Sequence, residues 1–212
     1  MLELKGFVKL EDLTSIHKLY KSDFTIAYDF HYGIAKDVYF FVAGAMVVDA
    51  ASGKIILDGL GDRLRVRKTL FKIGNTTSHT LNEIIKYSKD QVDKTGLYSS
   101  FFGPNQNNYG HFWCDAIPRL VFLRRFKKPI TLLHYNTAGP YQQEALKAIQ
   151  ELYPNVDFEF MSRTSIWRLE KYLLPSAVTQ KGTFYIPHYA LPFVRKIMFH
   201  IAGIKDYVEP MS

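Results

Sequence analysis

Residues 97–120 read LYSSFFGPNQNNYGHFWCDAIPRL, which indicates a short apolar strand, a polar turn and then a helix. Asn108 has the side chain of a helix N-cap, whose oxygen accepts a hydrogen bond from an amide two or three residues further on. From the next residue onward, the helical period places Asn108, His111, Asp115 and Arg119 on one narrow face. An adjoining apolar stripe is expected to pack against a core, and it comprises Phe112, Ala116, Leu120 and Leu123.

The polar stripe supports two interpretations. His111 and Asp115 are four residues apart, so they can form a proton-transferring pair at a helix start, where unpaired amides carry a partial positive charge. The same spacing also occurs in surface pairs worth a few tenths of a kcal/mol, and Asp115 with Arg119 can form a solvated salt bridge of small value. Pro118 favours a site, because a proline inside a helix costs roughly 3 kcal/mol unless a kink is wanted.

The string that begins at Asn108 and ends at Leu120, Asn-Tyr-x-His-Phe-x-x-Asp-x-x-Pro-Arg-Leu, resembles the signature of glycosyltransferase family 61. That family includes capsular polysaccharide biosynthesis proteins and eukaryotic xylosyl- and N-acetylglucosaminyltransferases. In this chain Gly110 replaces an aromatic residue common before the histidine, and a tryptophan–cysteine pair replaces an aliphatic pair. A looser resemblance extends over about residues 38–195.

The resemblance implies inverting transfer of a sugar from a nucleotide-sugar donor to a hydroxyl of a glycan or protein acceptor. It implies a base that takes the acceptor proton, for which Asp115 is the best candidate, with His111 either its orienting partner or the base itself. The expected substrate-binding residues are Asn108, Tyr109, Arg119, His134 and His188. No Asp-x-Asp motif of the kind that holds a metal–diphosphate occurs, so neither a metal nor another cofactor is expected.

Members of the family have two Rossmann-like lobes, and the second lobe carries a His-Gly-Ala segment near the nucleotide. No such segment occurs here, and the chain ends soon after Tyr207, about where a second lobe begins in the family. We therefore expect either the N-terminal, acceptor-side lobe of a GT-B-like enzyme, with a missing C-terminal lobe as its partner, or a short divergent form of such an enzyme. The alternative is a non-catalytic glycan-binding or assembly domain of the same fold.

The composition is that of a folded, basic chain. Its 212 residues are 47% hydrophobic and 15% aromatic, which is ample for a packed core. The net charge of +7 permits three anionic partners: nucleic acid, a membrane surface, or a nucleotide-sugar or acidic glycan. No nucleic-acid-binding motif is present, so nucleic acid is not expected. Cys114 is the single cysteine and cannot form an internal disulfide.

The sequence shows no targeting segment. Residues 1–6 lack the basic start and apolar run of a signal peptide. The longest apolar run, residues 38–48, is too short to span a bilayer. We expect a cytoplasmic protein, with peripheral membrane contact permitted by the positive charge.

The first half of the chain is β-rich and mixed. Residues 38–49 and 54–58 predict a β-hairpin around the loop Ala50–Gly53. A basic cluster at residues 63–72 is either a solvated outer face or a phosphate- or glycan-binding stripe. Residues 79–94 predict a helix that ends at Gly96.

The second half alternates strands and helices. The expected strands are 97–102, 130–135, 156–160 and 168–174, and the expected helices are 109–126, 141–152 and 192–202. This alternation predicts an α/β fold with a Rossmann-like, mostly parallel sheet covered on both faces by helices. We expect this sheet in residues 96–212, preceded by a β-hairpin region in residues 1–95, either as two regions or as one continuous domain. Ligands of such sheets bind beyond the carboxyl ends of the strands, where the turn 103–108 is expected.

Overall fold

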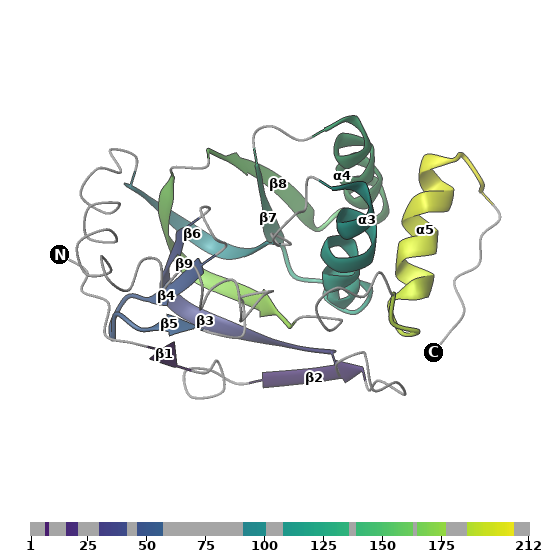
Figure 1. The fold of residues 1–212 in the computed structure, drawn as a ribbon. Coiled ribbons are helices and arrows are strands. Elements are labelled where there is room, and N and C mark those ends of the chain that lie inside the picture. The colour runs from purple at the N-terminus through teal and green to yellow at the C-terminus, as the bar shows by residue number, and fades with distance from the viewer. Residues whose placement is uncertain are drawn as a thin grey trace.

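A computed structural model of the chain describes nine segments, namely residues 7–8, 16–20, 30–41, 46–56, 91–100, 108–135, 139–162, 165–176 and 186–205. These residues form one mixed β-sheet, with helices stacked beside it (Figure 1). The fold is therefore of the α/β class. Within these segments, no helix is both long enough and apolar enough to cross a membrane.

The strands are β1 (Phe7–Val8), β2 (Ile16–Tyr20), β3 (Phe30–Phe41), β4 (Met46–Asp49), β5 (Ile55–Ile56), β6 (Gln91–Ser100), β7 (Ile130–Tyr135), β8 (Val156–Met161) and β9 (Ile166–Pro175). The main helices are α4 (Pro140–Leu152) and α5 (Leu191–Ile201). A third helical stretch joins α3 (Tyr109–His111), the π-helical turn η3 (Phe112–Ala116) and the 3₁₀ helix η4 (Ile117–Arg124) without a break. We call residues 109–124 the signature helix.

The sheet order is β1-β5-β4-β3-β9-β6-β7-β8, and β2 pairs with the other edge of β3 outside this path. Strands β9, β6, β7 and β8 are parallel to one another, whereas β9 is antiparallel to β3 along its length. The prediction of a mostly parallel sheet is therefore wrong for the whole sheet and holds only for this half. The reason is that β9 returns between β3 and β6, so a single sheet includes strands from both halves of the chain. The boundary expected between residues 95 and 96 falls inside β6.

The predicted hairpin is confirmed at its loop and corrected in its first arm. The amide of Gly53 donates to the carbonyl of Asp49 at 2.9 Å, and Gly53 has a φ of 67°, which favours glycine. Val48 pairs with Ile55 across this turn. The expected arm 38–49 is two strands, because β4 folds back antiparallel on β3.

The expected helix over residues 79–94 is wrong at its end. Residues 91–94 belong to β6, which pairs in parallel with β9. Long-range pairing has prevailed here over a weak local helical pattern. Residues 79–90 and the basic cluster at 63–72 lie outside the described residues.

Several predicted elements of the second half are confirmed. Strands β7, β8 and β9 cover the ranges expected around residues 130–135, 156–160 and 168–174. Helix α4 begins with Pro140 at its first position, where the missing amide hydrogen is no loss. Helix α5 carries Pro192 in its first turn and ends within a residue of the predicted limit.

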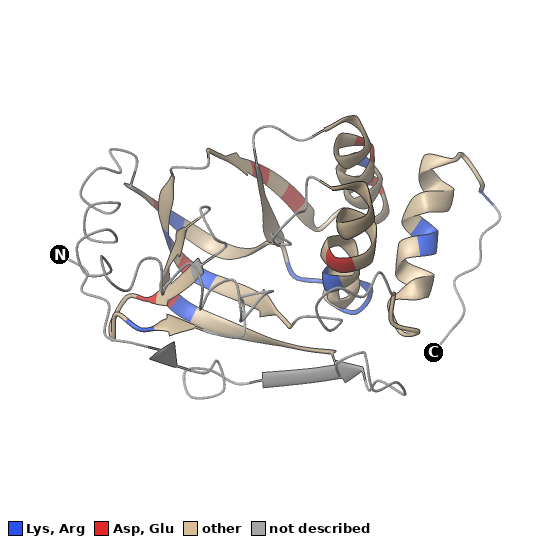
Figure 2. Cartoon of the chain, viewed as in Figure 1, with Lys and Arg blue, Asp and Glu red and all other residues tan. Residues whose placement is uncertain are grey.

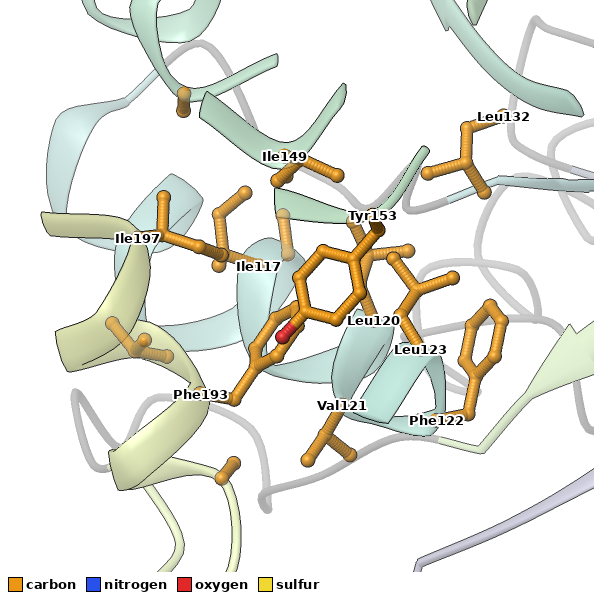
Figure 3. Packing of buried hydrophobic residues seen from close by; sticks show 14 of the residues in the cluster. Ile117, Leu120, Val121, Phe122, Leu123, Leu132, Ile149, Tyr153, Phe193 and Ile197 are labelled. Atoms are coloured by element: carbon orange, nitrogen blue, oxygen red, sulfur yellow. The ribbon is translucent and has the colours of Figure 1, made fainter. Parts of the chain in front are cut away.

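One hydrophobic core lies between the helices and one face of the sheet (Figure 3). The signature helix contributes fully buried side chains, among them Ile117, Leu120 and Phe122. They pack with Ile149 of α4 and Phe193 of α5, both also fully buried. All described helices share this core, so they cover one face, whereas helices were expected on both.

A second buried cluster lies on the opposite face of the sheet. Leu132 belongs to the first cluster and its neighbour Leu133 to the second, because successive side chains of a strand point to opposite faces. In β3 this alternation changes parity at Asp37, which has a φ of 50°. Phe30 packs on the helix side, whereas Val38 and Phe40 pack on the other.

Strands β9 and β6 also have a backbone irregularity, at the same level of the sheet as Asp37. In β9 the second cluster takes odd-numbered residues up to Leu169 and even-numbered residues from Tyr172 onward. In β6 the register with β9 shifts between Lys94 and Leu97, around Gly96, which has a φ of 104°. A line of backbone irregularities therefore crosses three adjacent strands at one level of the sheet.

Candidate functional site

The signature helix starts as the sequence predicts. Asn108 has extended backbone angles, with φ −86° and ψ 129°, and its Oδ1 accepts a hydrogen bond from the amide of His111 at 3.3 Å. The N-cap is therefore confirmed. This bond fixes the backbone of His111 at the mouth of the helix, which lies just beyond the carboxyl end of β6.

The predicted pair of titratable groups is formed. Nδ1 of His111 lies 2.6 Å from Oδ2 of Asp115, and the two side chains are 23% and 39% exposed. An ionised carboxylate can only accept, so Nδ1 carries the hydrogen that is donated to Asp115. In the neutral ring Nε2 then holds the lone pair, which is the arrangement of a base oriented by a carboxylate.

A π-helical turn follows directly on His111 and includes Asp115. The amide of Ile117 donates to the carbonyl of Phe112, five residues back. Pro118 cannot donate, so a regular helix has a gap in its hydrogen bonds at this point. The change from π to 3₁₀ geometry at Ile117 accommodates the proline inside a continuous helical stretch.

Arg119 differs from the prediction. Its side chain is buried, 5% exposed, and Nη2 donates to the carbonyl of Pro175 at 3.1 Å. It therefore does not continue the exposed stripe of His111 and Asp115, because the altered helical pitch turns this position toward β9. Burial lowers the pKa of Arg119, and the nearby Tyr172 and Asp115 oppose that shift.

Arg119 belongs to a group of buried polar residues at the carboxyl ends of β6 and β9. The hydroxyl of Tyr172 bonds to that of Ser100, and Ser99 donates to the carbonyl of Leu173 at 2.8 Å. Burial raises the pKa of Tyr172, so this phenol stays neutral. The arrangement ties the signature helix to the sheet on which the site is built.

The two more distant histidines differ in burial. His134 near the end of β7 is fully buried, with its ring edge-on to Phe160 at a centroid distance of 5.9 Å. His188 is exposed and lies in the turn before α5. Among the expected site residues, hydrogen bonds thus connect Asn108, His111 and Asp115.

Aromatic rings gather at the same mouth. Tyr109 is 60% exposed. Its ring lies edge-to-face with that of Tyr141 of α4, at a centroid distance of 5.2 Å, and with that of Trp113, at a centroid distance of 6.3 Å. Phe112 contacts Tyr141 at 5.4 Å. Tyr141 and Trp113 were not predicted as site residues. Pro140 signals a helix start at the same sheet edge, and Tyr141 could have been found from that signal.

The described residues contain no group of side chains suited to a metal ion. Within the described segments, no three His, Cys, Asp or Glu side chains are grouped so that they could hold a metal ion. Cys114 is half-buried, and burial together with the charge of Asp115 raises the pKa of its thiol. The thiol is therefore a poor nucleophile in this position.

Charge is distributed unevenly along the signature helix. Four basic residues follow one another at and beyond its carboxyl end, where the helix dipole favours them: Arg124, Arg125, Lys127 and Lys128 (Figure 2). In contrast, the sequence from Gly96 to Pro118 contains no Lys or Arg and one acidic residue, Asp115. The arrangement at the mouth can accept a proton and contact an uncharged ring.

The chain matches no protein-family model, no curated protein and no solved structure.

Proposed function

We propose that this chain is the acceptor-activating part of an inverting glycosyltransferase that uses a nucleotide-sugar donor. The hydrogen-bonded pair of His111 and Asp115 at the mouth of the signature helix carries the proposal. The resemblance of residues 108–120 to the signature of glycosyltransferase family 61 supports the same reaction, because His111 and Asp115 both stand at positions of that signature.

In the proposed reaction His111 is the base and Asp115 its orienting partner. Nε2 of His111 takes the proton of the acceptor hydroxyl while that oxygen attacks the anomeric carbon of the donor. The bond from this carbon to the diphosphate oxygen breaks, and the nucleoside diphosphate leaves with the electron pair. Asp115 accepts from Nδ1 and stabilises the imidazolium that forms.

A plain surface pair accounts less well for these observations. Surface pairs at this spacing contribute a few tenths of a kcal/mol and need no special backbone. Here the pair lies in a segment with an N-cap, a π-helical turn and an internal proline. π-helical turns occur frequently at functional sites.

The donor's diphosphate needs positive charge or hydrogen-bond donors. Arg119 is buried against β9 in this structure, and the mouth otherwise carries no Lys or Arg between residues 96 and 118. We therefore assign the acceptor side to the described residues. The donor side is assigned to a further lobe or to the basic cluster at residues 63–72. A cytoplasmic location at or near a membrane suits this reaction.

The test is a transfer assay with the full protein, a panel of UDP-, GDP- and CMP-linked sugars, and release of free nucleotide as the signal. His111→Gln should lower the rate by about 10²–10⁴-fold, the usual contribution of general base catalysis. Asp115→Asn should lower it less, because the base remains. Wild-type rates in both variants refute the proposal, and a larger loss in Asp115→Asn makes Asp115 the base.

A non-catalytic glycan-binding domain is the second candidate, and the exposed ring of Tyr109 favours it. A binding domain retains saccharide affinity when His111 is replaced and releases no nucleotide from any donor. Ligand-observed NMR with oligosaccharides, run beside the transfer assay, separates the two candidates.

A further inference from the structure

Tyr109 is an exposed aromatic ring in a fixed position. It occupies the first residue of the signature helix, and Tyr141 and Trp113 support its ring edge-to-face. Tyrosine has few rotatable bonds, so a ring held in this way binds a partner with little loss of conformational entropy. Its outer surface is available, since 60% of the residue is accessible.

Trp113 carries a buried donor beside this ring. Trp113 is 6% exposed, and its Nε1 is buried without a hydrogen-bond partner in the structure as described. A buried donor with no acceptor is costly and uncommon in folded proteins.

The charge of the region selects between possible ligands. The sequence from Gly96 to Pro118 holds only Asp115 as a charged residue, and that from Pro129 to Leu146 holds only Glu144. These segments supply the carboxyl ends of β6 and β7 and the first turns of the signature helix and α4. These segments offer a diphosphate no Lys or Arg, and Arg119, the next residue after Pro118, is buried and donates to the carbonyl of Pro175.

We propose that Tyr109 and Tyr141 form an aromatic platform for a neutral sugar ring of the acceptor. This inference rests on the proposed function, since it names the acceptor subsite of the same reaction. The C–H face of a pyranose packs against the electron-rich face of an aromatic ring, and its hydroxyls remain at the rim. Tyr109 and His111 are two residues apart in the first turn of the signature helix, so the platform and the proposed base belong to the same end of one helix.

Trp113 provides a native reporter of binding, because the chain has only two tryptophans. In a Trp167→Phe background, the emission of Trp113 is followed while maltose, cellobiose, xylobiose, chitobiose and UDP are added separately. At least one disaccharide should change the emission. Tyr109→Ala should weaken that binding about tenfold or more, the loss seen for a nucleobase when one stacking ring is removed. Tyr109→Phe should retain most of it.

Phe160→Ala is the matched control, because Phe160 is an aromatic residue of similar exposure, 52%, on β8. It should leave binding unchanged. The far-UV circular dichroism of each variant shows whether the fold is kept, and Tyr109→Leu retains an apolar side chain if the alanine variant unfolds. Equal affinities in the Tyr109→Ala and Phe160→Ala variants overturn the platform, and so does binding of UDP alone through Tyr109.

The outcomes for the platform and for the transferase are separable. If His111→Gln abolishes transfer while Tyr109→Ala leaves the acceptor KM unchanged, the transferase stands and the platform is refuted. If Tyr109→Ala abolishes disaccharide binding while His111→Gln has no effect on transfer, the platform stands and the assigned base is refuted.

Discussion

Asp37 is the residue on which the alternation of β3 depends, and its replacement tests that part of the fold. It adopts a φ of 50° in the middle of a strand. Its two carboxylate oxygens accept from Nε and Nη2 of Arg168 at 2.7 and 3.0 Å. Three variants separate the effect of backbone strain from the effect of the carboxylate charge. Asp37→Asn removes the charge and keeps a short polar side chain. Asp37→Gly removes the Cβ as well, whereas Asp37→Ala keeps the Cβ without a polar group.

The backbone effect can be sized from this geometry. A residue with a Cβ pays about 1–2 kcal/mol in the left-handed region, and Asp and Asn avoid part of this through local hydrogen bonds. Gly avoids the steric cost but loses about 0.5–1 kcal/mol through its freer unfolded state. We expect stability to fall in the order wild type, Asn, Gly, Ala. At an m-value near 2–3 kcal/mol/M, Asp37→Ala should lower the urea midpoint by about half a molar.

The charge effect follows from pH. The Arg168 guanidinium lowers the pKa of the Asp37 carboxyl below its ordinary value. This contribution is fully present above the unfolded pKa of about 3.9 and is lost as pH falls through the lower folded value. The advantage of wild type over Asp37→Asn should therefore be seen at pH 7 and vanish in stronger acid. Both partners are exposed, so added salt should reduce it as well. Equal midpoints for Asp37→Ala and Asp37→Gly would refute the backbone argument.

Two further predictions concern the signature helix. Asn108→Ala should cost about 1 kcal/mol of stability in urea unfolding, whereas Asn108→Ser should cost little, since a serine oxygen can also accept from the amide of His111. Phe122→Ala should cost about 3–5 kcal/mol, because Phe122 is fully buried against Tyr32 of β3 and Phe126. Both tryptophans should report the same unfolding midpoint in this variant, and separate midpoints contradict one cooperative unit.

The sequence predicts best the elements whose signals are local. The strands at 130–135 and 156–160 are short apolar runs between turn residues, and the helix from Pro140 has both a start signal and a buried stripe. The N-cap of Asn108 and the spacing of His111 and Asp115 are also local, and both appear in the structure.

The sequence fails where the outcome depends on distant residues. Residues 91–94 form a strand because β9 pairs with them across more than 70 positions of sequence, which no local pattern encodes. The same return of β9 between β3 and β6 makes the sheet mixed. Arg119 was assigned to an exposed stripe by a regular helical period, and the π-helical turn before it changes that period.

The uneven charge of the chain now bears on its chemistry. A net charge of +7 permits an anionic ligand, but within the described signature helix the first basic residue after the His111–Asp115 pair is Arg119, which is buried. Basic residues follow the carboxyl end of the signature helix, whereas the sequence around its mouth carries Asp115 without a Lys or Arg. A diphosphate needs compensating positive charge within a few ångströms, because charges further apart are screened by salt. Under the proposed function, the described mouth takes the uncharged acceptor, and the positive groups that a nucleotide-sugar needs come from another segment.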